Sequence, residues 1–285
     1  MHILKTTVAA SLLLGAVVAS ASELKVTSYN PADKGVFPVS SSLITGDKEA
    51  ILVDAQFGVG DGQALVDMIR ASGKTLTTIY ISGGDPDYYF GLEPIVNAFP
   101  NAKVIASRSV VEHIQKTKDA KLSYWGGILG VQAPKTLIVP TVSNQTRFRL
   151  EGKTIEVREI NTHQAYLWVP SIKTALGGVL VSSGIHLWTA DSQTKAARQE
   201  WIDALNRLVA LKPKKVVPGH FMGDVPVGSQ AVIFSRDYLT TYEKLLDEKT
   251  TSTQLVEGLK AAYPNLPLDA GVTISAKVNT GEMKW

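Results

Sequence analysis

Short apolar runs alternate with amphipathic stretches along this chain, and the two patterns predict strands and helices in turn. Residues 41–45 and 50–53 are rich in apolar residues, and the turn-forming residues 46–49 join them. Residues 63–72 carry apolar side chains at helical spacing, and Gly73 follows as a stop signal. Strands that come first and are each followed by helices predict an α/β protein with sheets covered by helices.

The same two patterns continue to the end of the chain. They predict strands at 77–81, 102–106, 166–169, 173–181 and 216–217, strand-like alternation over 136–157, a strand that ends at 160–163, and helices at 92–99, 107–116, 194–211, 231–247 and 252–262. No repeat, low-complexity segment or linker interrupts them, so we expect a single domain over residues 22–285.

The N-terminal residues have the pattern of an export signal. Lys5 gives the short basic region, residues 8–20 are apolar but too short to span a membrane, and Ala19-Ser20-Ala21 fits a cleavage site. The alternative is a buried N-terminal helix, but the abrupt change to polar residues at Glu23 favours processing. We therefore expect residues 1–21 to be a signal peptide and the mature protein to be periplasmic or secreted, without a membrane anchor.

Composition narrows the classes of function. The chain has 285 residues, a net charge of +3 and no cysteine. Its basic residues are scattered apart from Lys212, Lys214 and Lys215, which fit a solvated turn, so we expect no nucleic-acid partner. Without cysteine, thiol nucleophiles and cysteine-based zinc sites are excluded.

The segment after the strand at 77–81 carries the most informative chemistry. Residues 82–92 place two carboxylates, Asp85 and Asp87, among glycines, yet contain no histidine. Asp85-Pro86-Asp87 also fits ordinary turn chemistry, because aspartate side chains commonly accept hydrogen bonds from loop amides. Both interpretations are open from these residues alone.

The order and spacing of several segments resemble the metallo-β-lactamase superfamily over about residues 36–225. The matching segments are 37–39, 43–44, 50–54, 79–81, 99–106, His163, 169–178 and 216–220. This resemblance implies an α/β fold of four layers, an αββα sandwich, and a hydrolase that uses metal ions.

In that family the loop reads His-x-His-x-Asp-His, and a glycine follows after two further residues. Aligning that glycine with Gly91 places Gly83 and Asp85 at the two first-metal histidines. Asp87 then falls at the aspartate and Tyr88 at the second-metal histidine. The resemblance therefore implies one conserved ligand in this loop, Asp87, and one substitute, Asp85.

The resemblance places the remaining ligand positions further along the chain. His163 falls at the third first-metal histidine and His220 at the last histidine of the second site. The remaining Asp or Cys position is occupied by Gly178 or Val179, neither of which can coordinate through its side chain. Two ligands would be left for each metal, so we do not expect a two-zinc centre.

A mononuclear site is the arrangement that these residues favour. Asp85, Asp87, His163 and His220 would bind zinc or another divalent transition metal. The implied function is an exported hydrolase that cleaves an ester, lactone or amide bond in a small molecule by metal-activated water. We assign catalytic roles to Asp87 and to Tyr88, whose hydroxyl would donate to an oxyanion.

A metal-free, non-catalytic binding or structural protein of the same fold is the alternative, and the reduced number of ligands favours it. His186 lies among apolar residues and fits a core or rim histidine, although it is also the best reserve ligand. Asp54 follows a strand directly, and either caps the next loop or supports the site from behind. The sequence fixes neither the substrate nor the oligomeric state.

Overall fold

Two facing β-sheets form the centre of the molecule. Its structure is a computed structural model, which describes residues 23–267 and 269–285. The first sheet has six strands in the order in which they occur along the chain. They are β1 (Lys25–Tyr29), β2 (Ser41–Thr45), β3 (Glu49–Val53), β4 (Thr75–Ile81), β5 (Lys103–Ala106) and β6 (Thr141–Val142). The pairs β1–β2 and β2–β3 are antiparallel, whereas β3 to β6 are parallel.

The second sheet has five strands in the order β12-β10-β9-β8-β7. They are β7 (Arg147–Leu150), β8 (Lys153–Arg158), β9 (Tyr166–Val169), β10 (Thr174–Leu176) and β12 (Lys215–Val216). A separate pair of parallel strands, β11 (Ser182–Ser183) and β13 (His220–Phe221), lies beyond the ends of β10 and β12.

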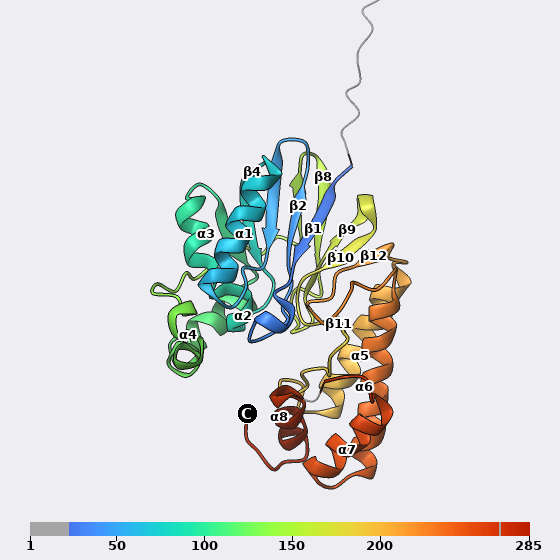
Figure 1. Cartoon of the computed structure of the whole chain (residues 1–285). Helices are drawn as coiled ribbons and strands as arrows, with labels where there is room; N and C mark the ends of the chain where they lie inside the picture. Colours follow the sequence, from blue (N-terminus) through green and yellow to red (C-terminus); the bar gives the residue numbers. More distant parts are fainter. Residues whose placement is uncertain (1–22, 268) are drawn as a thin grey trace, which may run out of the picture.

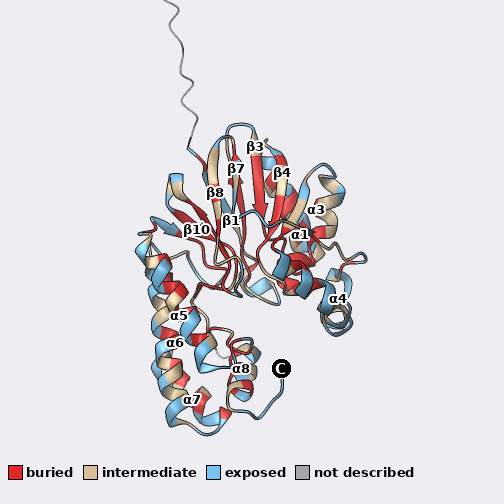
Figure 2. Cartoon of the chain, turned by 180° about the vertical axis from the view of Figure 1, so that it is seen from behind, coloured by how far each residue is buried: buried red, intermediate tan, exposed pale blue. Residues whose placement is uncertain are grey.

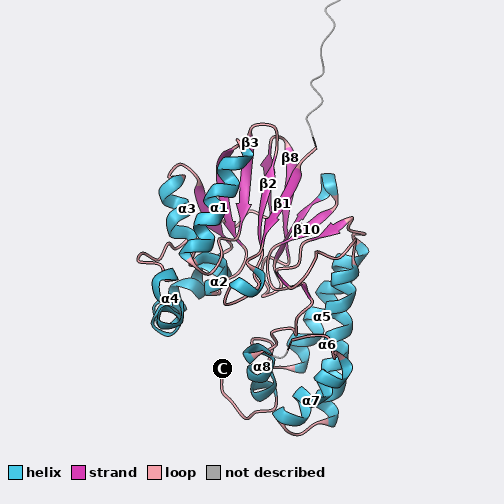
Figure 3. Ribbon diagram, viewed as in Figure 1, coloured by secondary structure: helices cyan, strands magenta, loops and turns pink. Residues whose placement is uncertain are grey.

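Helices flank the pair of sheets (Figures 1 and 3). The helices are α1 (Val59–Ser72), α2 (Pro86–Tyr89), α3 (Leu92–Ala98), α4 (Arg108–Leu129), α5 (Lys195–Ala210), α6 (Gln230–Glu248), α7 (Ser252–Ala262) and α8 (Ala270–Asn279). Short 3₁₀ turns lie at Ala32–Lys34, Gly130–Gln132 and Pro170–Ile172. Helices α7 and α8 extend below the sheets in the view of Figure 1.

The strand periodicity of two explains the four layers. In β3, Leu52 packs toward α1 and α3, while its neighbours Ile51 and Val53 pack between the two sheets. In the second sheet, Trp168 of β9 contacts the cluster that contains Trp201 of α5. Figure 2 shows the buried residues concentrated in the strands and on the inner helix faces. The predicted αββα sandwich is thereby confirmed.

Several predicted elements need correction. The strand expected over residues 173–181 is only β10, because Gly177 and Gly178 adopt φ values of 80° and 71°, which end the strand. The helix expected at 107–116 continues to Leu129. Helices α2 and α8 were not predicted. β8 ends at Arg158, so His163 lies in the loop between β8 and β9 and not at a strand end.

Residues 1–21, the predicted signal peptide, lie outside the described residues, so export stays a prediction. The single domain over residues 22–285 also stays a prediction. Among the residues that the structure describes, no helix combines the length and apolar character needed to cross a membrane.

The ends of three strands are joined by a buried hydrogen-bond network. Asp54, directly after β3, accepts hydrogen bonds from the Ser82 amide to Oδ1 (2.8 Å) and from the Ser82 hydroxyl to Oδ2 (2.6 Å). The Ser82 hydroxyl in turn accepts one from the Gly178 amide at 2.8 Å. Ser82 follows β4 of the first sheet, and Gly178 follows β10 of the second sheet. The network therefore joins the two sheets at the point where the loops after β4 and β10 begin.

Candidate active site at the strand ends

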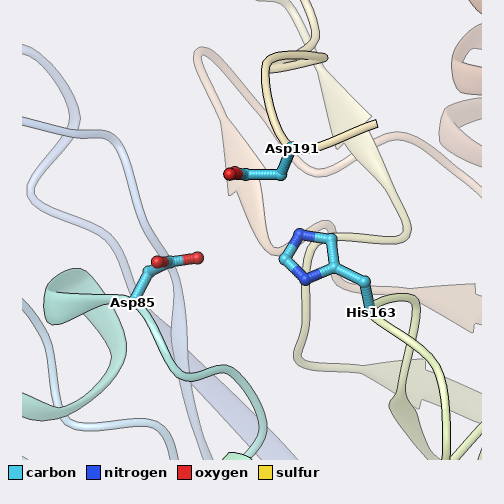
Figure 4. Close-up of side chains that lie close together, drawn as sticks. All are labelled: Asp85, His163 and Asp191. Carbon is cyan, nitrogen blue, oxygen red and sulfur yellow. The ribbon is translucent and has the colours of Figure 1, made fainter. Parts of the chain in front are cut away.

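Two aspartate side chains and one histidine side chain come together in loops that follow strands of the two sheets. Asp85, His163 and Asp191 each offer one ligand atom, and these atoms lie within 4.8 Å of one another. Figure 4 shows the Asp85 side chain directed toward His163, with the Asp191 carboxylate above the two in this view. The three residues come from the β4–α2, β8–β9 and β11–α5 loops. No other group of this kind occurs among the described residues.

Asp85 also contacts two basic side chains of α4. Lys121 donates a hydrogen bond from Nζ to Oδ1 of Asp85, and His113 Nε2 lies 3.7 Å from the same oxygen. Burial raises the pKa of the Asp85 carboxyl, but His113 and the Lys121 ammonium outweigh this and hold that pKa well below its usual range. Asp85 is therefore a carboxylate whose charge is already balanced by a protein cation.

Asp87 and His220 form a direct pair beside this group. His220 Nε2 lies 2.7 Å from Asp87 Oδ2, and both side chains are largely buried. Since an ionised carboxylate only accepts hydrogen bonds, the imidazole donates Nε2–H to Asp87. The other ring nitrogen, Nδ1, makes no hydrogen bond to any described residue.

Tyr88 fills the place next to Gly83. A Cβ atom at Gly83 would lie 2.5 Å from the Tyr88 ring, so any side chain there would collide with the phenol. Tyr88 is buried, and its hydroxyl has no hydrogen-bond partner in the described part of the chain. Burial and the nearby carboxylates of Asp87 and Asp54 raise the pKa of Tyr88 well above its ordinary value, so it stays a neutral donor.

Asp54 supports the site from the interior. Its side chain is fully buried, and burial raises its pKa to about 7 against the lowering effect of its hydrogen bonds with Ser82. The charge of Asp87 raises this pKa further and that of His220 lowers it, which places Asp54 within electrostatic reach of the pair. The sequence offered this supporting role as one of two alternatives.

The structure thus divides the four residues expected to share one ion. Asp85 and His163 lie together, and Asp87 pairs with His220. The three-residue group takes Asp191 as its third member, which sequence reasoning missed because an aspartate in a loop before a helix gives no periodic signal. Lys121, which contacts Asp85, was also missed.

His186, the reserve ligand, lies in the core of the second half of the chain. Its Nδ1 atom is 2.9 Å from the Tyr238 hydroxyl, whereas its buried Nε2 atom has no partner in the described residues. Burial lowers the pKa of the imidazole, which keeps it neutral. It belongs to no metal-binding group of the described chain.

Comparison with known protein families shows to which superfamily the chain belongs. The sequence profile of the metallo-β-lactamase superfamily matches residues 35–220. The chain belongs to the metallo-β-lactamase superfamily. That family implies a metal-dependent hydrolase, and it typically binds zinc. Among curated proteins, none matches this metallo-β-lactamase-fold chain by sequence.

Solved structures share the fold at low sequence identity. A metallo-β-lactamase from Pontibacter korlensis is 18% identical with a TM-score of 0.54, covering 76% of this chain and 99% of its own. VMB-1 is 16% identical with a TM-score of 0.55, covering 79% and 95%. The DIM-1 metallo-β-lactamase is 16% identical with a TM-score of 0.53, covering 78% and 99%. These similarities concern the fold alone.

The usual two-metal set of this superfamily does not fit the site. Gly83 has no room for a ligand because of Tyr88, and a Cβ at Gly178 would lie 2.0 Å from the Ala165 carbonyl oxygen. By contrast, two carboxylates and one imidazole form an acceptable donor set for a single zinc, iron or manganese ion. Asp85, His163 and Asp191 therefore fit one ion and not two.

Proposed function

We propose that this protein is an exported hydrolase that cleaves an ester, lactone or amide bond in a small molecule, with one divalent metal ion held by Asp85, His163 and Asp191. The observation that supports it is the convergence of these three ligand atoms within 4.8 Å, at the loop ends where the family carries its chemistry. Three protein ligands leave an open coordination position, as in catalytic zinc sites. When bound, such an ion would act as a Lewis acid that polarises a carbonyl group and acidifies water.

The neighbouring pair supplies acid–base chemistry. Asp87 holds the His220 ring through the 2.7 Å hydrogen bond, which leaves Nδ1 free to take up a proton and return it to a leaving group. This role needs no second ion, and it differs from the sequence-based expectation that Asp87 and His220 are ligands.

Tyr88 supplies a neutral hydroxyl. This hydroxyl is buried and has no partner among the described residues, so a substrate carbonyl that reaches it would receive a hydrogen bond as the oxyanion develops. Asp87 and Tyr88 thus keep the catalytic roles assigned to them, as part of the proposal.

Metal content is the direct test. The mature protein would be purified with zinc, iron and manganese present, and its metal measured by mass spectrometry beside Asp85→Ala, Asp191→Ala and the matched control Asp203→Ala. Asp203 is a half-buried acid on α5 that accepts a hydrogen bond from Gln199 of the same helix. We expect about one equivalent in the wild type and the control, and a loss in the two site variants.

A metal-free binding protein is the second candidate, and the contact between Lys121 and Asp85 favours it. An ammonium group on a carboxylate neutralises the charge that an ion would neutralise. Less than about a tenth of an equivalent of metal in the wild type would establish this candidate and remove the hydrolase proposal.

Hydrolysis of an aryl ester, a lactone and a chromogenic β-lactam, measured with and without chelator, then decides whether any activity depends on the ion.

A further inference from the structure

Two tryptophans hold the carboxylate of Asp191. Trp188 donates a hydrogen bond from Nε1 to Oδ2 at 2.6 Å, and Trp285 donates one from Nε1 to Oδ1 at 2.8 Å. The two indole rings meet edge to face, with centroids 5.1 Å apart. Each oxygen of Asp191 therefore has one donor, and the donors also brace each other.

Indole donors fix a carboxylate without removing its charge. The two oxygens of a carboxylate offer about four lone-pair sites, so two N–H donors leave sites on both oxygens for another partner. The Lys121 ammonium neutralises the charge of Asp85, whereas an indole is neutral. The negative charge of Asp191 therefore stays available to a cation. Outer groups that orient a ligand carboxylate in this way are a regular part of metal sites.

Trp285 is brought to Asp191 by a segment that is itself fixed. Glu282 accepts hydrogen bonds from the amide and the hydroxyl of Ser252, both at 2.6 Å. The amides of Glu282 and Met283 both donate to the Lys277 carbonyl, at 2.8 and 3.1 Å. The segment after α8 is thereby attached to α7 and α8 directly before it reaches the site.

We propose that Trp285 and Trp188 are positioning residues that hold Asp191 toward Asp85 and His163, so that the segment after α8 completes the candidate site. For its effect on metal binding, this inference rests on the proposed function. Trp285 lies outside residues 35–220, which match the family profile, so the profile match does not include this contact.

The hydrogen bonds can be tested without metal. The chain has five tryptophans, so a proton–nitrogen correlation spectrum shows five indole signals, which Trp285→Phe and Trp188→Phe assign. In Asp191→Ala we expect the Trp188 and Trp285 signals to shift and to exchange faster with solvent, while the others keep their positions. Unchanged signals of these two residues would overturn the proposal, whatever the protein binds.

Zinc affinity tests what the hydrogen bonds do. Phenylalanine keeps an aromatic ring but removes the N–H donor, and Trp285 is 53% exposed, so the fold tolerates the change. We expect the zinc dissociation constant to rise about tenfold or more in the Trp188→Phe/Trp285→Phe double variant, and to stay unchanged in the control Met283→Ala. An equal constant in wild type and double variant would refute the positioning role. If the wild type takes up neither zinc nor iron nor manganese, the proposed function fails instead, and the indole signals alone decide whether Asp191 is held.

Discussion

The imidazole of His220 donates a hydrogen bond from Nε2 to Oδ2 of Asp87 over 2.7 Å, across 133 residues of sequence. In the family motif these two positions carry ligands of the second metal. In this chain they bond to each other, which satisfies the Asp87 carboxylate without an ion. In the proposed function the pair acts as an oriented acid–base pair and not as a pair of metal ligands.

Neutralising Asp87 tests this pair. In Asp87→Asn the amide keeps the shape of the side chain but no longer offers an anion to the imidazole. We expect hydrolysis of the best substrate to fall by about 10²-fold or more, and the free energy of unfolding to fall by about 1–3 kcal/mol. Steady-state kinetics and urea unfolding measure the two effects. Asp237→Asn, at an exposed ion pair, is the control, and full activity in Asp87→Asn would contradict the assignment.

Removing the Tyr88 hydroxyl separates a structural from a catalytic role. Because this buried hydroxyl has no partner in the described chain, Tyr88→Phe removes an unsatisfied polar group, and the melting temperature should be equal or higher. If the hydroxyl donates to the oxyanion, kcat should fall by about 10²-fold in the same variant. A variant that is stable and fully active would show that Tyr88 only fills the space above Gly83.

Replacing Lys121 tests whether its ammonium competes with a cation for Asp85. In Lys121→Met the carboxylate loses its charged partner, so the metal-free protein should lose about 1–3 kcal/mol of stability. Zinc affinity should rise about tenfold, since an ion no longer has to displace the ammonium. Isothermal titration measures the affinity, and Lys118→Met on the same helix is the control. A zinc affinity that falls or stays equal would mean that Lys121 does not compete with the ion.

The sequence predicted the fold and the loop better than it predicted the partners of the site residues. Gly91 was a sound anchor for the register, because a Cβ there would lie 2.1 Å from the Ala55 carbonyl oxygen, so only glycine fits. The contact of Lys121 with Asp85 and that of Trp285 with Asp191 join residues 36 and 94 positions apart, respectively. No local pattern encodes such pairings, since they depend on how helices and loops pack around the sheets.

Asp54 makes stability depend on pH in a direction that can be measured. Burial raises its pKa to about 7 in the folded protein, from an ordinary value of 3.8. Between about pH 4 and pH 7 the folded state therefore binds this proton more strongly than the unfolded state. The stabilising contribution is fully present below the ordinary pKa and is lost as the pH rises through the folded pKa.

Asp54→Asn should flatten this dependence, because the amide resembles the neutral acid and still offers an oxygen to Ser82. We expect the urea midpoint of the wild type to fall between pH 4.5 and pH 8 more steeply than that of the variant. Ser82→Ala removes both the hydroxyl donor to Asp54 and the acceptor of the Gly178 amide. Since the Ser82 hydrogen bonds lower the pKa of Asp54, this variant should move the fall to higher pH. Parallel pH profiles of the wild type and Asp54→Asn would show that Asp54 is ionised throughout this range.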